Sequence, residues 1–153
     1  MEQDVEYVRA SASLPLLSRI VELDGKKLLD GGVCDSIPIR KFQSMGYARN
    51  IVVLTQYGGY RKQKSASLPL IRARYHAYPR FVEKMEDRHL RYNDTLDLLN
   101  EEEKKGNVLI IRPKKPVNIS RLEKNVEKLQ ALYDEGYADT AGMIQDIRAF
   151  LAG

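Results

Sequence analysis

Lys26-Lys-Leu-Leu-Asp-Gly-Gly-Val-Cys-Asp-Ser-Ile-Pro-Ile39 is a short apolar run that ends in a carboxylate and two glycines, with a helix-start signal a few residues later. A strand over its first residues would aim the carboxylate of Asp30, and Gly31 and Gly32 would let the main chain turn sharply beside it. Asp-Gly-Gly on its own is most often a plain turn. The residues on either side therefore determine how it is interpreted.

Two flanking segments give this stretch a specific meaning. Arg9-Ala-Ser-Ala-Ser-Leu-Pro15 precedes it, and Ile37-Pro-Ile39 follows at a fixed offset. Over about residues 5–56, the arrangement resembles the C-terminal part of the patatin-like phospholipase family. That family reads Ala-Ser-x-x-x-Pro, then Asp-Gly-Gly (or Asp-Gly-Ala), then Val-x-Asn-x-x-Pro-Val. Asp35 stands where the family has Asn, which is a small polar change.

The resemblance implies an α/β fold and a hydrolase. The fold would be a partial patatin-like three-layer arrangement, with a few mostly parallel strands flanked by helices and the C-terminal helices packed on it. In the family, a Ser-Asp dyad hydrolyses fatty-acyl esters of lipids, and we expect no cofactor and no metal. Asp30 would be the base of that dyad. The residues that would support the active site are Gly31, Gly32, Ser11 and Pro38.

Half of the expected machinery has no counterpart in these residues. The family carries its nucleophile in Gly-x-Ser-x-Gly, on a strained strand-to-helix turn, and no serine here has that setting. The glycine-rich loop of the oxyanion hole is also missing. The chain therefore resembles the second half of a hydrolase, and we expect it to be inactive alone. The alternative is a non-catalytic α/β interaction module that binds a protein partner or a membrane surface.

The length of the chain suits one domain, and its composition excludes few classes of function. The chain has 153 residues, a net charge of +4 and one cysteine, Cys34, so it has no internal disulfide and a reduced compartment is the simplest inference. The mild positive charge suits an anionic membrane or an acidic partner, and it suits an ordinary solvated surface equally well. Binding of nucleic acid is not expected, because the cations are scattered. With no secretory signal and no apolar run of about 20 residues, we expect a cytoplasmic or peripheral membrane protein.

The first part of the chain alternates strands with a helix. Residues 1–60 would be the C-terminal part of the catalytic domain, and 61–153 a helical and βα extension on the same domain. A hairpin is expected over 21–29, because Asp-Gly is a strong turn dipeptide. A short helix should run from Pro38 to a C-terminal Gly46. Residues 50–56 should form a strand buried on both faces, joined to the preceding strand by a right-handed crossover.

The rest of the chain is mostly helical in pattern. Helices are expected over 4–10 and 68–75, and a strand over 107–112. One long helix is expected over 80–105, with an apolar stripe at Val82, Met85, His89, Tyr92, Leu96 and Leu99. His89 is better explained as a hydrogen-bonded core residue than as a catalytic or metal-binding one, and His76 is unremarkable.

The C-terminal region should form an antiparallel helical pair. A capping box at Ser120-Arg-Leu-Glu123 would open the first helix, Gly136 would break it, and the second would start at Tyr137. The core side of the first helix would be Leu122, Val126, Leu129 and Tyr133.

Three surface features leave alternatives open. The loop 57–64, with glycines, tyrosines and cations, could rest on a phospholipid surface, or it is a solvated basic loop. Lys114 and Lys115 could bind phosphate, or they form a plain connector. Bare strand edges favour a homo-oligomer.

Overall fold

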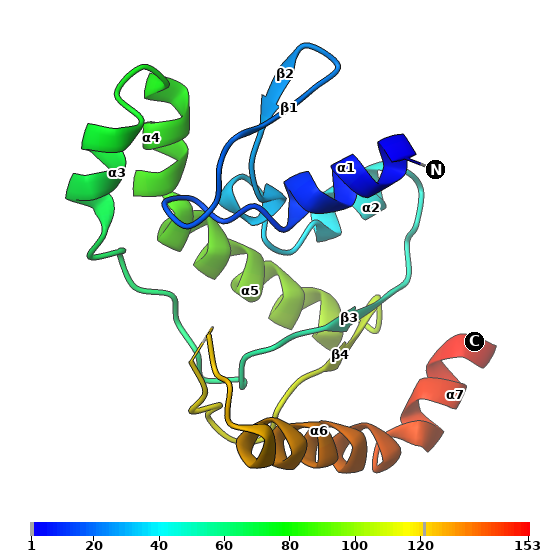
Figure 1. The fold of residues 1–153 in the computed structure, drawn as a ribbon. Helices are drawn as coiled ribbons and strands as arrows, with labels where there is room; N and C mark the ends of the chain where they lie inside the picture. Colours follow the sequence, from blue (N-terminus) through cyan, green and yellow to red (C-terminus); the bar gives the residue numbers. More distant parts are fainter. Residues whose placement is uncertain (1, 121) are drawn as a thin grey trace. The chain divides into compact units, whose positions relative to one another are not determined.

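The computed structural model describes residues 2–120 and 122–153 and has a mixed α/β fold (Figure 1). The chain divides into two compact units. The first comprises the residues up to Pro38 together with Lys62–Leu96, and the second comprises Ile39–Arg61 and Asp97–Gly153. Each unit therefore combines two stretches that are far apart in the sequence.

The first unit begins with helix α1 (Glu2–Ser11) and a β-hairpin. Strands β1 (Val21–Leu23) and β2 (Lys26–Leu28) pair antiparallel. Between them Asp24 has φ 50° and Gly25 φ 69°. Two left-handed residues in succession are what a two-residue hairpin turn requires, and Asp-Gly supplies them at low cost. The predicted hairpin is confirmed.

The core of this unit lies between the Asp-Gly-Gly loop and the helices that follow Ser67 and Tyr78. After the 3-10 turn η1 (Gly31–Val33), the chain returns to this unit with α3 (Leu68–Arg74), α4 (Pro79–Glu86) and the start of α5 (Arg88–Lys104). Helices α3 and α4 lie side by side (Figure 1). The buried side chains at the centre are Val33, Leu68, Ile71, Tyr75 and Met85.

The single long helix predicted over 80–105 is wrong. Two helices occupy the region and are separated at Asp87, which has φ −90° and ψ 0°. A side-chain N–H of Arg91 donates to the carbonyl of Lys84 at 2.7 Å and satisfies the end of α4. The apolar stripe is real, since Met85, Leu96 and Leu99 are buried. A period of three to four residues predicts which face is buried, but not whether the axis is continuous.

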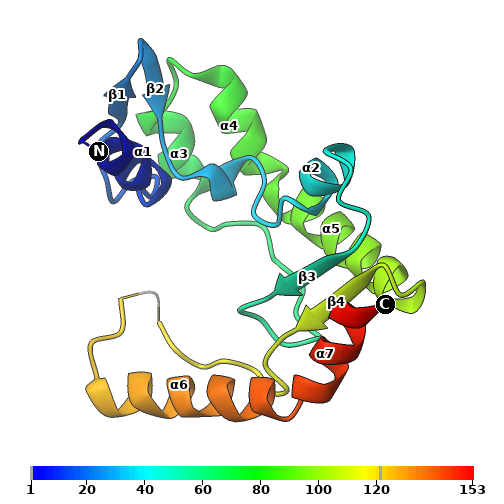
Figure 2. The same cartoon turned by 90° about the vertical axis from the view of Figure 1, so that its right-hand side faces the viewer.

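The second unit contains helix α2 (Ile39–Ser44) and a parallel pair of strands, β3 (Asn50–Val53) and β4 (Val108–Ile111). Figure 2 shows the two strands side by side. Asn50 pairs with Val108. Helix α2 follows Pro38 directly, and Gly46, with φ 93°, closes its end as predicted.

Two expectations about the strands are wrong. β3 does not join β2 in one sheet by a crossover, because β2 pairs with β1, and β3 with β4. β3 is also not buried on both faces, since Val53 is 71% exposed while Leu54, just beyond the strand, is buried. A parallel sheet is covered on both faces when helices flank it. The pair β3–β4 has no further strand in the described part of the chain.

The C-terminal helices α6 (Val126–Ala141) and α7 (Ile144–Ala152) also differ from expectation. α6 begins with Asn125, whose side chain accepts from the N–H of Lys128, and not at Ser120. Arg121, within the expected capping box, lies outside the described residues. α6 continues through Gly136, because one glycine costs a helix only about 1 kcal/mol relative to alanine.

These two helices form an elbow and not an antiparallel pair (Figures 1 and 2). The expected core side of the first is exposed, at Leu122, Val126, Leu129 and Tyr133. Arg49 ties α7 to its unit by donating to the carbonyl of Phe150 and lying 4.3 Å from the centre of that ring. Among the described residues, no helix has the length and apolarity that a membrane span requires.

Candidate functional site

Asp30 lies two residues beyond β2 and forms the N-cap of η1. Its Oδ1 accepts a 2.7 Å hydrogen bond from the main-chain N–H of Gly32. Its own N–H donates to the carbonyl of Ser13 at 2.9 Å, which ties it to the small-residue loop after α1. Ser13 is buried, and its hydroxyl donates to the carbonyl of Arg9. The strand, the cap and this loop together fix the position of a half-buried carboxylate.

The two glycines after Asp30 differ in their surroundings. Neither adopts a left-handed main-chain conformation, so neither is needed for a positive φ. A Cβ on Gly32 would lie 3.0 Å from Oδ1 of Asp30, whereas one on Gly31 would meet no described atom within 4 Å. Close approach of the carboxylate therefore favours glycine at 32, and the side of the chain at Gly31 is open.

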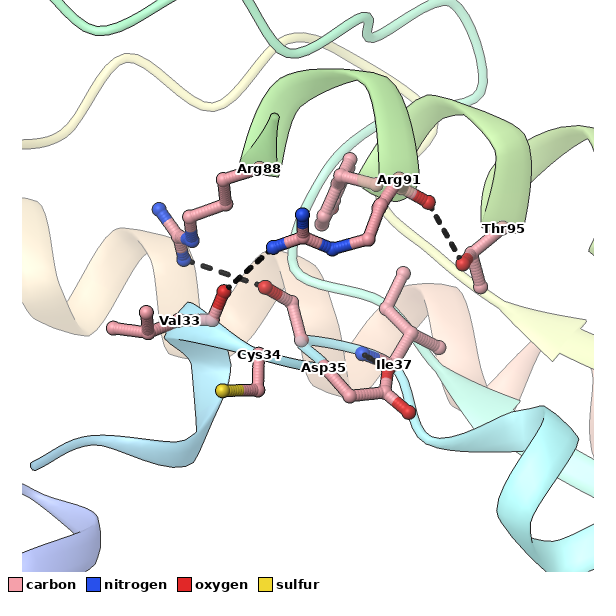
Figure 3. A pocket seen from close by; sticks show the side chains of 9 residues that line it. Val33, Cys34, Asp35, Ile37, Arg88, Arg91 and Thr95 are labelled. Atoms are coloured by element: carbon pink, nitrogen blue, oxygen red, sulfur yellow. Dashed lines mark hydrogen bonds between the residues drawn. The ribbon is translucent and has the colours of Figure 1, made fainter. Parts of the chain in front are cut away.

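Two arginines at the start of α5 bind the loop that follows Asp30 (Figure 3). Nε of Arg88 donates to the carbonyl of Gly32 at 2.7 Å, and Nη2 to the hydroxyl of Ser36 at 3.3 Å. Nη2 of Arg91 donates to the carbonyl of Val33 at 3.1 Å. A small cavity of about 20 Å³ lies between this loop and the helix.

Sequence reasoning did not identify these arginines. A signal was available, because both lie in the first turn of α5, which contains no acidic residue. The positive end of the helix dipole favours acidic residues there and disfavours cations. Two cations at three-residue spacing in that position indicate a local acceptor that offsets the unfavourable dipole interaction.

An apolar cleft of about 270 Å³ has Asp30 in its wall. The hairpin and η1 form one part of the lining, and α4 with the residues between α3 and α4 forms the other. Its other lining residues are Ile20, Lys27, Leu28, Leu29, Gly31, Val33, Cys34, Tyr75, Tyr78 and Phe81. A concave, mostly apolar surface with one carboxylate in its wall suits an apolar ligand that carries a single reactive polar group.

A second charged residue of the lining is Lys27. Its Nζ bonds the hydroxyl of Tyr78 at 3.1 Å and lies 5.5 Å from the centre of that ring. The hydrogen bond to Tyr78, followed by the charge interactions with Tyr78 and Glu22, raises the pKa of Lys27 above its usual value. Lys27 therefore places a positive charge in the lining of the cleft.

Residues 5–42 match the family model of patatin-like phospholipases. Residues 78–152 match a second family, described as a domain of unknown function (DUF6363). No curated protein and no solved structure matches the chain. The first match is short, and it supports a lipid acyl hydrolase family for the segment that contains Asp30.

The patatin-like segment thus holds the carboxylate, and the second matched segment holds both arginines. Of the residues expected to support the site, Gly31 and Gly32 adjoin Asp30. Ser11 is exposed at the end of α1, and the contact with Asp30 comes from Ser13 instead. Pro38 is exposed immediately before α2.

The histidines lie outside the site that the patatin-like segment forms. Nδ1 of half-buried His89 lies 3.0 Å from the carbonyl of Glu86, and Nδ1 of exposed His76 lies 3.1 Å from that of Ala73. Each ring therefore contacts a main-chain carbonyl at the C-terminal end of the preceding helix, α4 for His89 and α3 for His76. Within residues 2–120 and 122–153 there is no cluster of three or more metal-ligating side chains.

Several of the basic residues considered as ligand-binding groups have partners within the chain. Arg61 pairs with Asp97, and Lys62 lies 4.5 Å from the centre of the Tyr92 ring. Lys114 pairs with a carboxylate on α6, that of Asp139, at 2.9 Å, and this bond lowers the pKa of Asp139. Because these cations already have partners, the loop and the connector are better described as part of a fixed surface than as a free basic patch.

Proposed function

We propose that this chain supplies the general base of a patatin-like serine acyl hydrolase, with Asp30 as that base. The observation that carries the proposal is a carboxylate at the end of a strand, fixed at Oδ1 by Gly32 and facing an apolar cleft. The match of residues 5–42 to patatin-like phospholipases supports it independently.

In this mechanism a serine hydroxyl attacks the ester carbonyl, and its proton passes to Asp30. The tetrahedral intermediate then collapses, the alcohol leaves with the proton from Asp30, and an acyl-serine remains. A water molecule attacks the acyl-serine with Asp30 as base, which releases the carboxylic acid and the free serine. Holding Oδ1 leaves Oδ2 of Asp30 to exchange the proton.

The proposal requires a serine and oxyanion donors from another polypeptide segment, since Gly-x-Ser-x-Gly does not occur in these 153 residues. A base without a nucleophile gives little catalysis. The 153-residue chain alone should therefore not hydrolyse esters.

The substrate that fits is an ester of a fatty-acyl chain, with the chain in the apolar cleft. Residues 1–60 contribute the catalytic loop, and the extension from 61 onward contributes Tyr75, Tyr78 and Phe81 to the opposite wall. Apolar lining favours a hydrocarbon chain over a polar acyl group, because burial of each methylene contributes about 0.8 kcal/mol.

The test uses a polypeptide that joins this chain to a segment carrying Gly-x-Ser-x-Gly. Asp30→Asn keeps the shape and removes the base, so p-nitrophenyl ester hydrolysis should fall at least about a thousandfold, within the range of general-base and oxyanion effects. The matched control is Asp35→Asn, an exposed carboxylate on the same loop whose replacement restores the residue usual in the family. Full activity in the Asp30→Asn variant would remove the proposal.

A second candidate is an interaction module, and the exposed apolar residues of α6 favour it. Val126, Tyr133 and Tyr137 are among the exposed large side chains. The rings of Tyr133 and Tyr137 stack with their centres 6.5 Å apart. In this alternative, Asp30→Asn leaves function intact, and Tyr133→Glu abolishes binding of the partner.

A further inference from the structure

The loop that carries the proposed base is bound by residues of the other matched segment. We propose that Arg88, assisted by Arg91, is a positioning residue for Asp30. The second segment, described as a domain of unknown function, would then hold the catalytic loop of the first. This inference rests on the proposed function for its catalytic meaning, but its geometry is independent of it.

Both polar main-chain groups of Gly32, the N–H and the carbonyl, are hydrogen-bonded. Its N–H bonds Oδ1 of Asp30 at 2.7 Å. Its carbonyl accepts from Nε of Arg88 at 2.7 Å and from the hydroxyl of Ser36 at 2.7 Å. Arg88 also bonds the same hydroxyl, so Gly32, Ser36 and Arg88 form a closed triangle of hydrogen bonds. The residue that orients the carboxylate is therefore itself held by a guanidinium.

Arg91 bonds the next residue of the loop and also a second helix. It bonds the carbonyl of Val33 on the loop and the carbonyl of Lys84 at the end of α4. Val33 is buried in the core beside Ile71 and Met85. The hydrophobic contact of Val33 and the hydrogen bond to its carbonyl thus fix the C-terminal side of the loop.

The charges of the two arginines make these bonds strong. A hydrogen bond with an ionised donor is shorter and about twice as strong as a neutral one. The helix dipole opposes cations at this position, and hydrogen bonds to main-chain carbonyls help to stabilise the guanidinium groups there. Half-burial of both arginines reduces the competition from water. A flexible loop would leave Asp30 in several orientations, and these hydrogen bonds restrict the loop.

The test is amide hydrogen exchange by NMR on the 153-residue chain, with Arg88→Met as the main variant. Methionine keeps the apolar stem of the side chain and removes the guanidinium. We expect exchange at the Gly32 N–H to rise by about tenfold or more, while the buried amide of Ile71 keeps its rate. Arg88→Lys, which restores the charge and one donor, should recover most of the protection.

The matched control is Arg72→Met. Arg72 is an arginine of the same unit that pairs with Glu86 and does not adjoin the loop. The Arg72→Met substitution should leave the amide exchange rates of Gly32 and Ile71 unchanged. Unchanged exchange at Gly32 in Arg88→Met would overturn the inference. So would an equal rise at Gly32 and Ile71, because that pattern reports loss of global stability alone. Since no activity is measured, failure here is distinguishable from failure of the Asp30→Asn test.

Discussion

The main-chain N–H of Gly32 donates to Oδ1 of Asp30 at 2.7 Å, and a Cβ on Gly32 would lie 3.0 Å from that same oxygen. The carboxylate therefore bonds the main chain of Gly32 and also occupies the space that a side chain at this position would need. Gly31, one residue earlier, has open space where its side chain would be. Two adjacent glycines of one motif therefore have different physical constraints.

Alanine at these two positions should have effects of opposite sign on stability. Gly31→Ala should raise the free energy of unfolding by up to about 1 kcal/mol, because it restricts the unfolded chain and meets no atom in the folded one. Gly32→Ala should lower it by about 0.5–1 kcal/mol, because the carboxylate of Asp30 must rotate away from the new methyl group. Urea unfolding of the two variants measures both changes. A destabilised Gly31→Ala chain would show that the space at Gly31 is filled.

A charge in the wall of the apolar cleft should weaken binding of an acyl chain. Cys34 lines the cleft and is exposed, so Cys34→Glu should fold normally. Binding of a neutral fluorescent monoacylglycerol should weaken by about tenfold, since the probe would then have to displace water from a carboxylate. Cys34→Ser, which adds no charge, is the control and should bind as the wild type does. Equal affinity in the two variants would place the acyl chain elsewhere.

The chain should lose stability in acid partly through Glu102, a buried carboxylate of the second unit. Its hydrogen bond to Lys105, and then that to Asn107, lowers the pKa of Glu102 below the usual 4.5, against the effect of burial. A lowered folded-state pKa adds stability above the unfolded-state value, and this stability is lost as the pH falls through the folded-state pKa. Glu102→Gln should therefore be less stable than the wild type near neutral pH.

Urea midpoints measured between about pH 7 and pH 3 test this prediction. The difference in urea midpoint between the wild type and Glu102→Gln should shrink as the pH falls through and below 4.5. Glu83→Gln, at an exposed glutamate on α4, is the control substitution. A gap that does not change with pH would contradict the assignment to Glu102.

The start of α6 gives a direct comparison of two candidate caps. Asn125→Ala removes the acceptor for the N–H of Lys128 and should destabilise the helix by about 0.5–2 kcal/mol. Ser120→Ala should have no measurable effect, because Ser120 lies before the helix. Exchange at the Lys128 amide reports the difference. Equal effects of the two substitutions would move the start of the helix back toward Ser120.

Local features of this fold could be predicted from the sequence, and features that depend on distant residues could not. The turn at Asp24-Gly25 and the end of α2 at Gly46 each depend on a few adjacent residues, and both predictions were confirmed. β3 and β4 were located correctly as strands, but the sheet to which β3 belongs depends on contacts between residues far apart in the sequence. An apolar period also cannot show whether a neighbour covers it, which is why Val126 is exposed.

The same distinction applies to the site. Asp30 could be singled out because a short motif carries it. Arg88 and Arg91 could not be connected to it, because their acceptors are main-chain carbonyls that lie more than fifty positions away in the sequence. A main-chain carbonyl has no sequence signature. An unfavourable cation at a helix start was the available clue.

Cys34 has a practical consequence. It is the one cysteine of the sequence, its thiol is exposed, and it lines both the apolar cleft and the small cavity beside the arginines. A maleimide spin label or fluorophore attached there would report on both hollows without any engineered handle or background labelling. The wild-type chain can therefore be labelled for such a measurement without introducing a cysteine.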